Sequence, residues 1–154
     1  METHTFQPLL HGPYPPVLAQ GPEGQTFVCH AITDKYLVLT PEEWVRQNLL
    51  LHLLALGYPA GRIATERLVR VGRLRRRFDV LVYDADGQPY LVAECKAPEV
   101  GLGLQAQGQA AAYNQTLQAR YVLLTNGRVA EVYTRQGAGY AVCPGMPGPP
   151  EGRV

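Results

Sequence analysis

Two acids and a lysine interrupt segments that are otherwise apolar. Asp79 begins the run DVLVY, and Glu94 and Lys96 follow in LVAECKAP. Carboxylate oxygens are ligands that Mg²⁺ prefers, and proteins usually hold this ion with one or two carboxylates, water molecules and the phosphate oxygens of a substrate. A lysine beside such an ion stabilises negative charge or orients a water molecule. The three residues therefore indicate a Mg²⁺ site, provided that the fold brings them together.

The chain between the two acids predicts a β-hairpin that places them opposite each other. Residues 78–83 (FDVLVY) and 90–95 (YLVAEC) have the composition of buried strands. Asp86-Gly87, between them, is a strong signal for a two-residue hairpin turn. Counting outward from that turn pairs Asp79 with Glu94, and directly opposed side chains have Cβ atoms roughly 4.5–5.5 Å apart.

Opposed carboxylates repel each other, and the apolar neighbours Val80 and Val92 lower the local dielectric and strengthen that repulsion. A divalent cation bound to both acids removes the conflict. An alternative is an ion pair between Glu94 and Lys96, which share one face of a strand because they are two residues apart. The ion pair leaves Asp79 without an explanation, so the metal site is the interpretation that covers all three residues.

A run of arginines precedes this hairpin. Residues 62–77 hold seven of the fourteen Lys and Arg residues and one acid, Glu66, although the net charge of the chain is only +1. Such a run can neutralise the phosphates of a nucleic acid, or it can be an ordinary solvated face. The residues predicted to contact nucleic acid are Arg73, Arg75, Arg76 and Arg77.

The elements that position these residues follow from periodicity and turn signals. In TPEEWVRQNLLLHLLALGY, a helix is expected with Thr40 as N-cap, Pro41 at the first helical position and Glu43 completing a capping box, and it ends at Gly57. Further strands are expected within FVCHAITDKYLVLT, IATERLVRV, RYVLLTNG and RVAEVYTR, and a second helix from about 102 to 118. This order predicts an α/β sandwich around a mixed β-sheet with flanking helices.

Length and composition fit one soluble domain, since the chain has 154 residues, of which 46% are hydrophobic and 18% are charged. We expect an irregular Gly/Pro-rich arm over residues 1–30, the folded domain over 31–142 and a disordered tail over 143–154. No apolar run is long enough to cross a membrane and the first residues lack a signal-peptide pattern, so a cytoplasmic location is expected. The three cysteines and four histidines show no disulfide or zinc spacing.

In this context the residues resemble a known nuclease signature. Asp79, followed fifteen residues later by Glu94-Cys95-Lys96, resembles the PD-(D/E)xK motif, with Phe78 in place of the usual proline. The segments LTPEEWVRQ, RRRFDVLVYDADGQPYLVAECKAP, QAAAYN and YVLLTNG together resemble the N-terminal nuclease domain of type I restriction enzyme R subunits, over about residues 34–134. The resemblance implies a restriction-endonuclease-like fold and an endonuclease that cleaves DNA with Mg²⁺ or Mn²⁺.

The resemblance also implies roles for individual residues. Asp79 and Glu94 would be the metal ligands, and Lys96 would be the catalytic lysine. The acid contributed by the first helix would be Glu43. Glu42 is the alternative, because the capping box already gives Glu43 a structural role.

Gln109 and Tyr113 match the Q-x-x-x-Y motif of related nucleases, and this spacing puts them on one helix face, although an ordinary amphipathic helix also explains the pair. The full R subunits carry a helicase motor with a GxxxxGK[ST] loop, which this sequence lacks. We therefore expect a nuclease domain that stands alone or is a fragment, with motor or specificity subunits of a restriction system as candidate partners. Two other interpretations stay open: a non-catalytic nucleic-acid-binding or assembly module that keeps the nuclease fold, and a structural domain whose acids pair with arginines.

Overall fold

The computed structural model describes residues 15–71, 73–103, 108 and 117–151. Three short strands come first: β1 (Leu18–Gln20), β2 (Thr26–Cys29) and β3 (Tyr36–Val38). The helix α1 (Pro41–Ala55) and a single 3₁₀ turn (Ala60–Arg62) follow. The other strands in the described residues are β4 (Ile63–Val71), β5 (Leu74–Tyr83), β6 (Pro89–Cys95), β7 (Tyr121–Thr125), β8 (Ala130–Gln136) and β9 (Gly139–Cys143).

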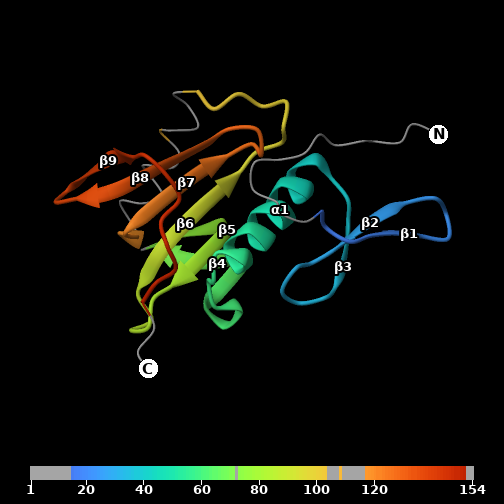
Figure 1. Ribbon diagram of the computed structural model, residues 1–154, viewed down its shortest axis with the longest axis horizontal. Helices are drawn as coiled ribbons and strands as arrows, with labels where there is room; N and C mark the ends of the chain where they lie inside the picture. Colours follow the sequence, from blue (N-terminus) through green and yellow to red (C-terminus); the bar gives the residue numbers. More distant parts are fainter. Residues whose placement is uncertain (1–14, 72, 104–107, 109–116, 152–154) are drawn as a thin grey trace.

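The strands form two sheets. β1, β2 and β3 make a small antiparallel sheet that extends to one side of the molecule, and β4 to β9 make a large sheet in sequence order (Figure 1). Neighbours in the large sheet are antiparallel except β6 and β7, which run parallel. Helix α1 lies across one face of this sheet (Figure 1). The fold is therefore α/β with a mixed sheet, which confirms the predicted fold class.

Helix α1 begins and ends where the sequence predicts. Thr40 is the N-cap, and its Oγ1 accepts a hydrogen bond from Glu43 N at 3.0 Å. Pro41 takes the first helical position, where its missing N–H costs nothing. Gly57 follows the helix with a φ of 95°, a conformation that favours glycine. The cap fixes the position of the acidic first turn relative to the sheet.

Apolar side chains cover both faces of β5 and β6. Alternate residues of these strands pack against α1 in one cluster, which includes Leu49, Leu50, Leu53, Val80, Val82, Leu91, Ala93 and Cys95. The intervening residues Leu81 and Val92 belong to a second cluster, with Phe78, Ala119 and Val122. Because successive strand side chains point to opposite faces, β5 and β6 form the centre of the core. Asp79 and Glu94, which are next to the paired residues Val80 and Ala93, therefore lie on a rigid support.

The β5–β6 pairing keeps the predicted register. Val80 pairs with Ala93, and Leu81 pairs with Val92. Hydrophobic alternation fixes this register, because a slip by one residue would turn every buried side chain toward the opposite face.

The turn of the same hairpin differs from the prediction. The prediction of a two-residue turn at Asp86-Gly87 is wrong, because the loop spans residues 84–88. Within the loop, Asp84 Oδ1 accepts hydrogen bonds from Asp86 N and Gln88 N, both at 2.9 Å. The register shifts at a β-bulge between Val82 and Tyr83. The one-residue shift at the bulge compensates for the different loop. Val80, Leu81 and Val82 therefore keep the partners that the two-residue turn predicts.

Segments that composition marks as irregular contain ordered structure. The predicted arm over residues 1–30 includes β1, and β9, which begins at Gly139, matches no predicted element. Of the predicted second helix, residues 102, 103, 108, 117 and 118 are described. Gly108 and Leu117 are helical, and the other three are not. Most of that segment lies outside the described residues.

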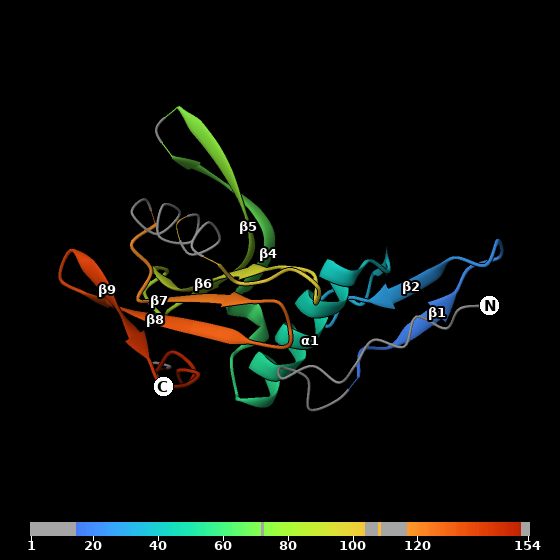
Figure 2. The ribbon, with the colours of Figure 1, turned by 90° about the horizontal axis from the view of Figure 1, so that it is seen from above.

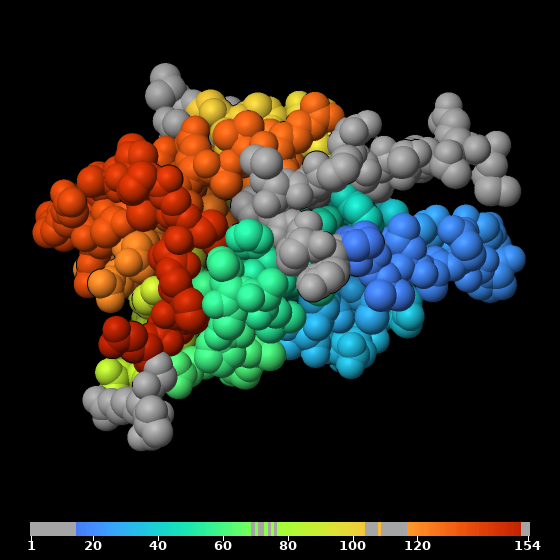
Figure 3. Space-filling view, viewed as in Figure 1, coloured from blue at the N-terminus to red at the C-terminus, as the bar shows by residue number. Residues whose placement is uncertain are grey.

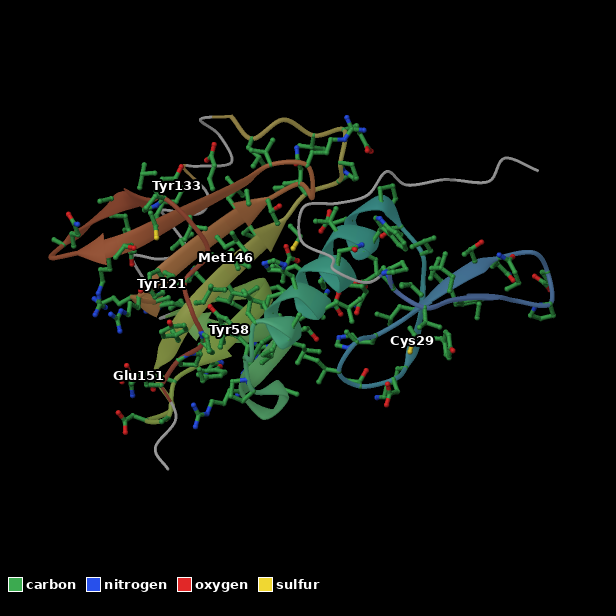
Figure 4. All side chains as sticks on the ribbon, viewed as in Figure 1. Cys29, Tyr58, Tyr121, Tyr133, Met146 and Glu151 are labelled. Carbon is green, nitrogen blue, oxygen red and sulfur yellow. The ribbon has the colours of Figure 1, made fainter. Side chains whose placement is uncertain are left out.

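The predicted disordered tail is ordered over residues 144–151, which run beside α1 (red in Figure 3). Tyr58 Oη donates to Pro147 O at 2.7 Å, and Tyr90 Oη donates to Gly148 O at 2.6 Å. Met146 packs against the core on the same side as Tyr58 (Figure 4). Proline and glycine disfavour helices and strands, but they do not prevent a segment from packing on a surface that offers hydrogen-bond donors.

Candidate functional site

The two predicted metal ligands meet at the outer end of the β5–β6 pairing. Beyond the pair Val80–Ala93, the next residue on each strand is Asp79 or Glu94. Asp79 is close enough to raise the pKa of Glu94 through its charge and through side-chain hydrogen bonding, and Cys95 N donates to Asp79 Oδ2 at 2.8 Å. The carboxyl groups are therefore in contact, as the hairpin register predicts.

Burial and the neighbouring Asp79 raise the pKa of the Glu94 carboxyl to about 8, and Lys96 offsets only part of this rise. Near neutral pH the pair therefore keeps a proton when no cation is bound. Strongly raised acid pKa values beside a second acid are typical of sites that bind cations or transfer protons, although structural networks produce them too.

Lys96 lies immediately after β6, and its backbone N–H continues the pairing with β7 by donating to Thr125 O at 2.8 Å. Its ammonium group is near enough to lower the pKa values of both Glu94 and Glu42. Within the described part of the chain, however, Lys96 makes no ion pair of 4.0 Å or less. The direct Glu94–Lys96 ion pair, the alternative left open by the sequence, is therefore not what this structure contains.

Arg46, in the second turn of α1, joins four carboxylates and is only 7% exposed. Its guanidinium nitrogens lie 2.7 Å from Glu66, 3.2 Å from Glu43, 3.3 Å from Asp79 Oδ1 and 3.9 Å from Glu42. Burial lowers the pKa of Arg46, but the carboxylates outweigh burial and the net shift is upward. Arg46 therefore holds the helix, β4 and β5 together through charge.

Glu66 carries this network from the helix to the arginine run. It lies on β4 between residues that pair with Val80 and Phe78, so it faces the position of Asp79 on β5. One of its oxygens bonds Arg46 and the other lies 3.0 Å from Arg77 Nη2. Its φ of 50° is in the left-handed region, which is costly for a residue other than glycine.

The two helix acids have different roles. Glu43, the expected helix acid, is 9% exposed, and its carboxylate accepts hydrogen bonds from Arg46 and Gln47, both at 3.2 Å. Glu42 instead has a raised pKa, caused first by burial and next by Asp79, while Arg46 and Lys96 act against the rise. Glu43 is therefore held by a buried ion pair with Arg46, whereas the pKa of Glu42 responds to Asp79 and Lys96. Which of the two helix acids takes part in the chemistry stays a prediction.

An open cavity of about 650 Å³ adjoins Glu42, Glu43 and Glu66. It is lined by Leu37, Val38, Thr40, Pro41, Glu42, Glu43, Arg46, Glu66, Ala97 and Glu99. The first turn of α1 and the segment after Lys96 thus form its walls. Asp79 and Glu94 are not among the residues that line it.

Other predicted site residues are only partly described. Gln109 and Tyr113 lie outside the described residues, as does the side chain of Arg76. Arg73 and Arg75 are exposed on the β4–β5 hairpin, and Arg77 is exposed but engaged with Glu66. The role of Arg46 in joining the carboxylates, and the role of Glu66, were not predicted from the sequence. The available signals were a charged residue inside the buried stripe of α1 and a lone acid within an arginine run.

The donor set at the site suits a hard divalent cation. Asp79 and Glu94 supply carboxylate oxygens from adjacent strands, and a cation would relieve the repulsion that raises the pKa of Glu94. Among the described residues, no group of three or more His, Cys, Asp and Glu residues is arranged to hold a metal ion. Mg²⁺ needs no more than one or two protein carboxylates, so the pair fits this ion but does not fit an all-protein cage.

Residues 41–147 match the family described as type I restriction enzyme R protein N terminus. The chain belongs to this family. The match begins at α1 and includes every strand of the large sheet, so the acids and arginines of the site all lie inside this R protein N-terminal region. No curated protein matches the chain. In the described residues, no helix is long and apolar enough to cross a membrane.

Proposed function

We propose that this R protein N-terminal region is a Mg²⁺-dependent phosphodiesterase that cleaves DNA, with Mn²⁺ as a substitute ion. The observation that carries the proposal is the contact between Asp79 and Glu94, with a pKa of about 8 for Glu94 and with Lys96 beside the pair. A buried acid pair is costly unless a cation or a proton neutralises it. The family supplies the context of DNA restriction.

Asp79 and Glu94 would hold the ion, each through a carboxylate oxygen, and Glu94 would give up its proton on binding because ligands must be deprotonated. When bound, Mg²⁺ acts as a Lewis acid on the phosphate and offsets its negative charge. Cys95 N fixes the orientation of Asp79 through its 2.8 Å hydrogen bond. The ligand geometry is thus set by the strand backbone.

Lys96 would stabilise the negative charge that develops on the phosphate. Its charge lowers the pKa of Glu94, so its ammonium group lies near the acid pair. Glu42 is the candidate general base, because its pKa is raised toward the working pH and it lines the cavity. The roles of Gln109 and Tyr113 stay predictions. DNA and other restriction subunits as partners, and a cytoplasmic location, also stay predictions.

A non-catalytic binding or assembly module is the second candidate, and one observation favours it. Both oxygens of Asp79 already accept hydrogen bonds, from Arg46 and from Cys95 N, so this acid is partly satisfied without a metal. A protein of this kind would bind DNA and leave it intact.

Plasmid nicking by the full chain tests the proposal. We expect conversion of supercoiled to open-circular DNA with Mg²⁺ or Mn²⁺, no conversion with EDTA, and strong loss of activity in Lys96→Ala. Lys35→Ala is the matched control, because Lys35 is an exposed lysine just before β3. DNA binding without nicking under either ion would favour the second candidate.

A further inference from the structure

The outer half of the β4–β5 hairpin stands away from the large sheet (Figure 2). β6 pairs with β5 from Val80 to Tyr83, and the four terminal pairs of the hairpin, from Leu68–Arg77 to Val71–Leu74, extend beyond that pairing. Four pairs at the usual rise make a two-stranded ribbon roughly 14 Å long. We name residues 67–71 and 73–77 the arginine ribbon.

The arginine ribbon is basic and has no acid or aromatic residue in its sequence. Two of its arginines have partners: Arg67 lies over the Tyr83 ring at 5.7 Å, and Arg77 pairs with Glu66. Arg70, Arg73 and Arg75 are exposed, and in the described residues none of them has an ion pair of 4.0 Å or less. These three are therefore available to an anionic partner.

Arg70 and Arg75 pair directly across the ribbon. Like charges that face each other across two strands destabilise the pairing. Leu68, on the same strand and the same face as Arg70, is 54% exposed. A polyanion bound along this face would remove the repulsion and cover the leucine.

The arginine ribbon is connected to the proposed active site. Strand alternation puts Arg75, Arg77 and Asp79 on one side of β5, about 13 Å apart from first to last. A chain of ion pairs follows the same path, from Arg77 to Glu66 at 3.0 Å, to Arg46 at 2.7 Å and to Asp79 at 3.3 Å. A nucleic acid held by the ribbon therefore has its backbone beside the acid pair.

We infer that the arginine ribbon inserts into the major groove of double-stranded DNA and presents one strand to Asp79 and Glu94. The major groove, about 12 Å wide, admits a two-stranded β-ribbon, and arginine can bond the O6 and N7 atoms of guanine there. Surfaces that bind single strands rely on aromatic side chains, which the ribbon lacks. The major groove of duplex RNA is too deep and narrow for side chains to read.

This inference rests on the proposed function for the role of the site, but its test is a binding measurement that needs no cleavage. The full chain is titrated in EDTA with labelled duplex DNA, duplex RNA and single-stranded DNA of one sequence. Protection of guanine N7 from dimethyl sulfate reports contact in the major groove. The variant is Arg70→Gln/Arg75→Gln, and the control Lys35→Gln/Arg120→Gln removes two exposed charges elsewhere.

We expect duplex DNA to bind most tightly, with N7 protection. The ribbon variant should lose roughly 10-fold or more in affinity, and its log–log salt slope should fall by about 0.9 per lost phosphate contact. The control should keep affinity and protection, and the melting temperature of the ribbon variant should not fall. An equal loss in the control, equal binding of duplex RNA, or binding without N7 protection would each overturn the inference.

The two proposals fail separately. A protein that binds duplex DNA through the arginine ribbon and never nicks it contradicts the proposed function alone. A protein that nicks DNA and binds it equally well after Arg70→Gln/Arg75→Gln contradicts the ribbon alone.

Discussion

Arg46 Nη2 lies 3.3 Å from Asp79 Oδ1, so a buried cation of the protein itself already contacts one of the two acids that we propose as metal ligands. The same guanidinium bonds Glu43 and Glu66, which come from the helix and from β4. Asp79 is thereby held in place before any ion binds. Arg46 is therefore a positioning residue.

Arg46→Met should lower the free energy of unfolding by about 3–5 kcal/mol, because it leaves several carboxylates at a buried site without their cation. Arg46→Lys should cost less, since it keeps the charge and loses the planar fork. Urea denaturation in EDTA measures both. Arg77→Met is the control: its ion pair with Glu66 is exposed and should be worth at most about 1 kcal/mol. Equal costs at the two positions would show that the buried network does not stabilise the site.

Stability in EDTA should fall as pH rises from about 4.5 to about 8, the unfolded and folded pKa values of Glu94. The folded protein binds more protons than the unfolded chain in this window, so the contribution is complete below it and is lost through the folded pKa. Each pKa unit corresponds to about 1.4 kcal/mol. Glu94→Gln should flatten the curve and stabilise the protein at the upper end.

Burial lowers the pKa of His30, so the titration of His30 makes stability rise with pH and opposes the effect of Glu94. The quantity to compare is therefore the difference in the free energy of unfolding between the parent and Glu94→Gln at each pH. Added Mg²⁺ should restore stability to the parent near the upper limit and leave Glu94→Gln unchanged. A difference curve that does not vary with pH would contradict the coupling of Asp79 and Glu94.

Glu42→Gln and Glu43→Gln should affect different properties. Glu43→Gln removes charge from a buried hydrogen bond to Arg46, and should cost about 1.5–3 kcal/mol of stability. Glu42 has a side chain that is 49% exposed, so Glu42→Gln should change stability by no more than about 0.5 kcal/mol while slowing nicking. Glu99→Gln, which alters the same cavity, is the control for nicking. If Glu42→Gln cuts as fast as Glu99→Gln, the helix acid is not part of the chemistry.

Tyr90→Phe should lower the free energy of unfolding by about 0.5–1.5 kcal/mol, because its hydroxyl bonds Gly148 O and holds the C-terminal segment. Nicking should not change, since Tyr90 is at the opposite end of β6 from Glu94. Tyr36→Phe provides the comparison, as Tyr36 is 53% exposed on β3. Identical stability of the two variants would mean that the segment is not held by this bond.

The register that joins Asp79 to Glu94 was predictable because apolar alternation in two adjacent strands leaves a single pairing that buries both sets of side chains. The capping of α1 was predictable for a similar reason, since Thr40, Pro41 and Glu43 act within one turn. In both cases the determining contacts are local in sequence or are set by a simple period.

Contacts across the fold were not predictable. Helix periodicity identifies Arg46 as near the buried face but does not reveal that it reaches Glu66 and Asp79, twenty and thirty-three residues away. The different surroundings of the two helix acids depend on that reach as well, because Arg46 lies 3.2 Å from Glu43 and 3.9 Å from Glu42. The turn at residues 84–88 was not predicted for a different reason. The side chain of Asp84 accepts hydrogen bonds from the backbone of the loop, and these bonds compete with a two-residue turn.

The most direct test of the central claim is Mg²⁺ titration calorimetry of Lys96→Ala beside its rate of plasmid nicking. Lys96→Ala should bind Mg²⁺ as the parent does, because both carboxylates remain, and should cut about 10²–10⁴ times more slowly. Asp79→Ala should lose both properties, and Cys95→Ala, whose thiol is buried against α1, should lose stability and keep the chemistry. A Lys96→Ala variant that nicks as fast as the parent, or a parent that binds no Mg²⁺ and cuts with neither ion, would contradict the account.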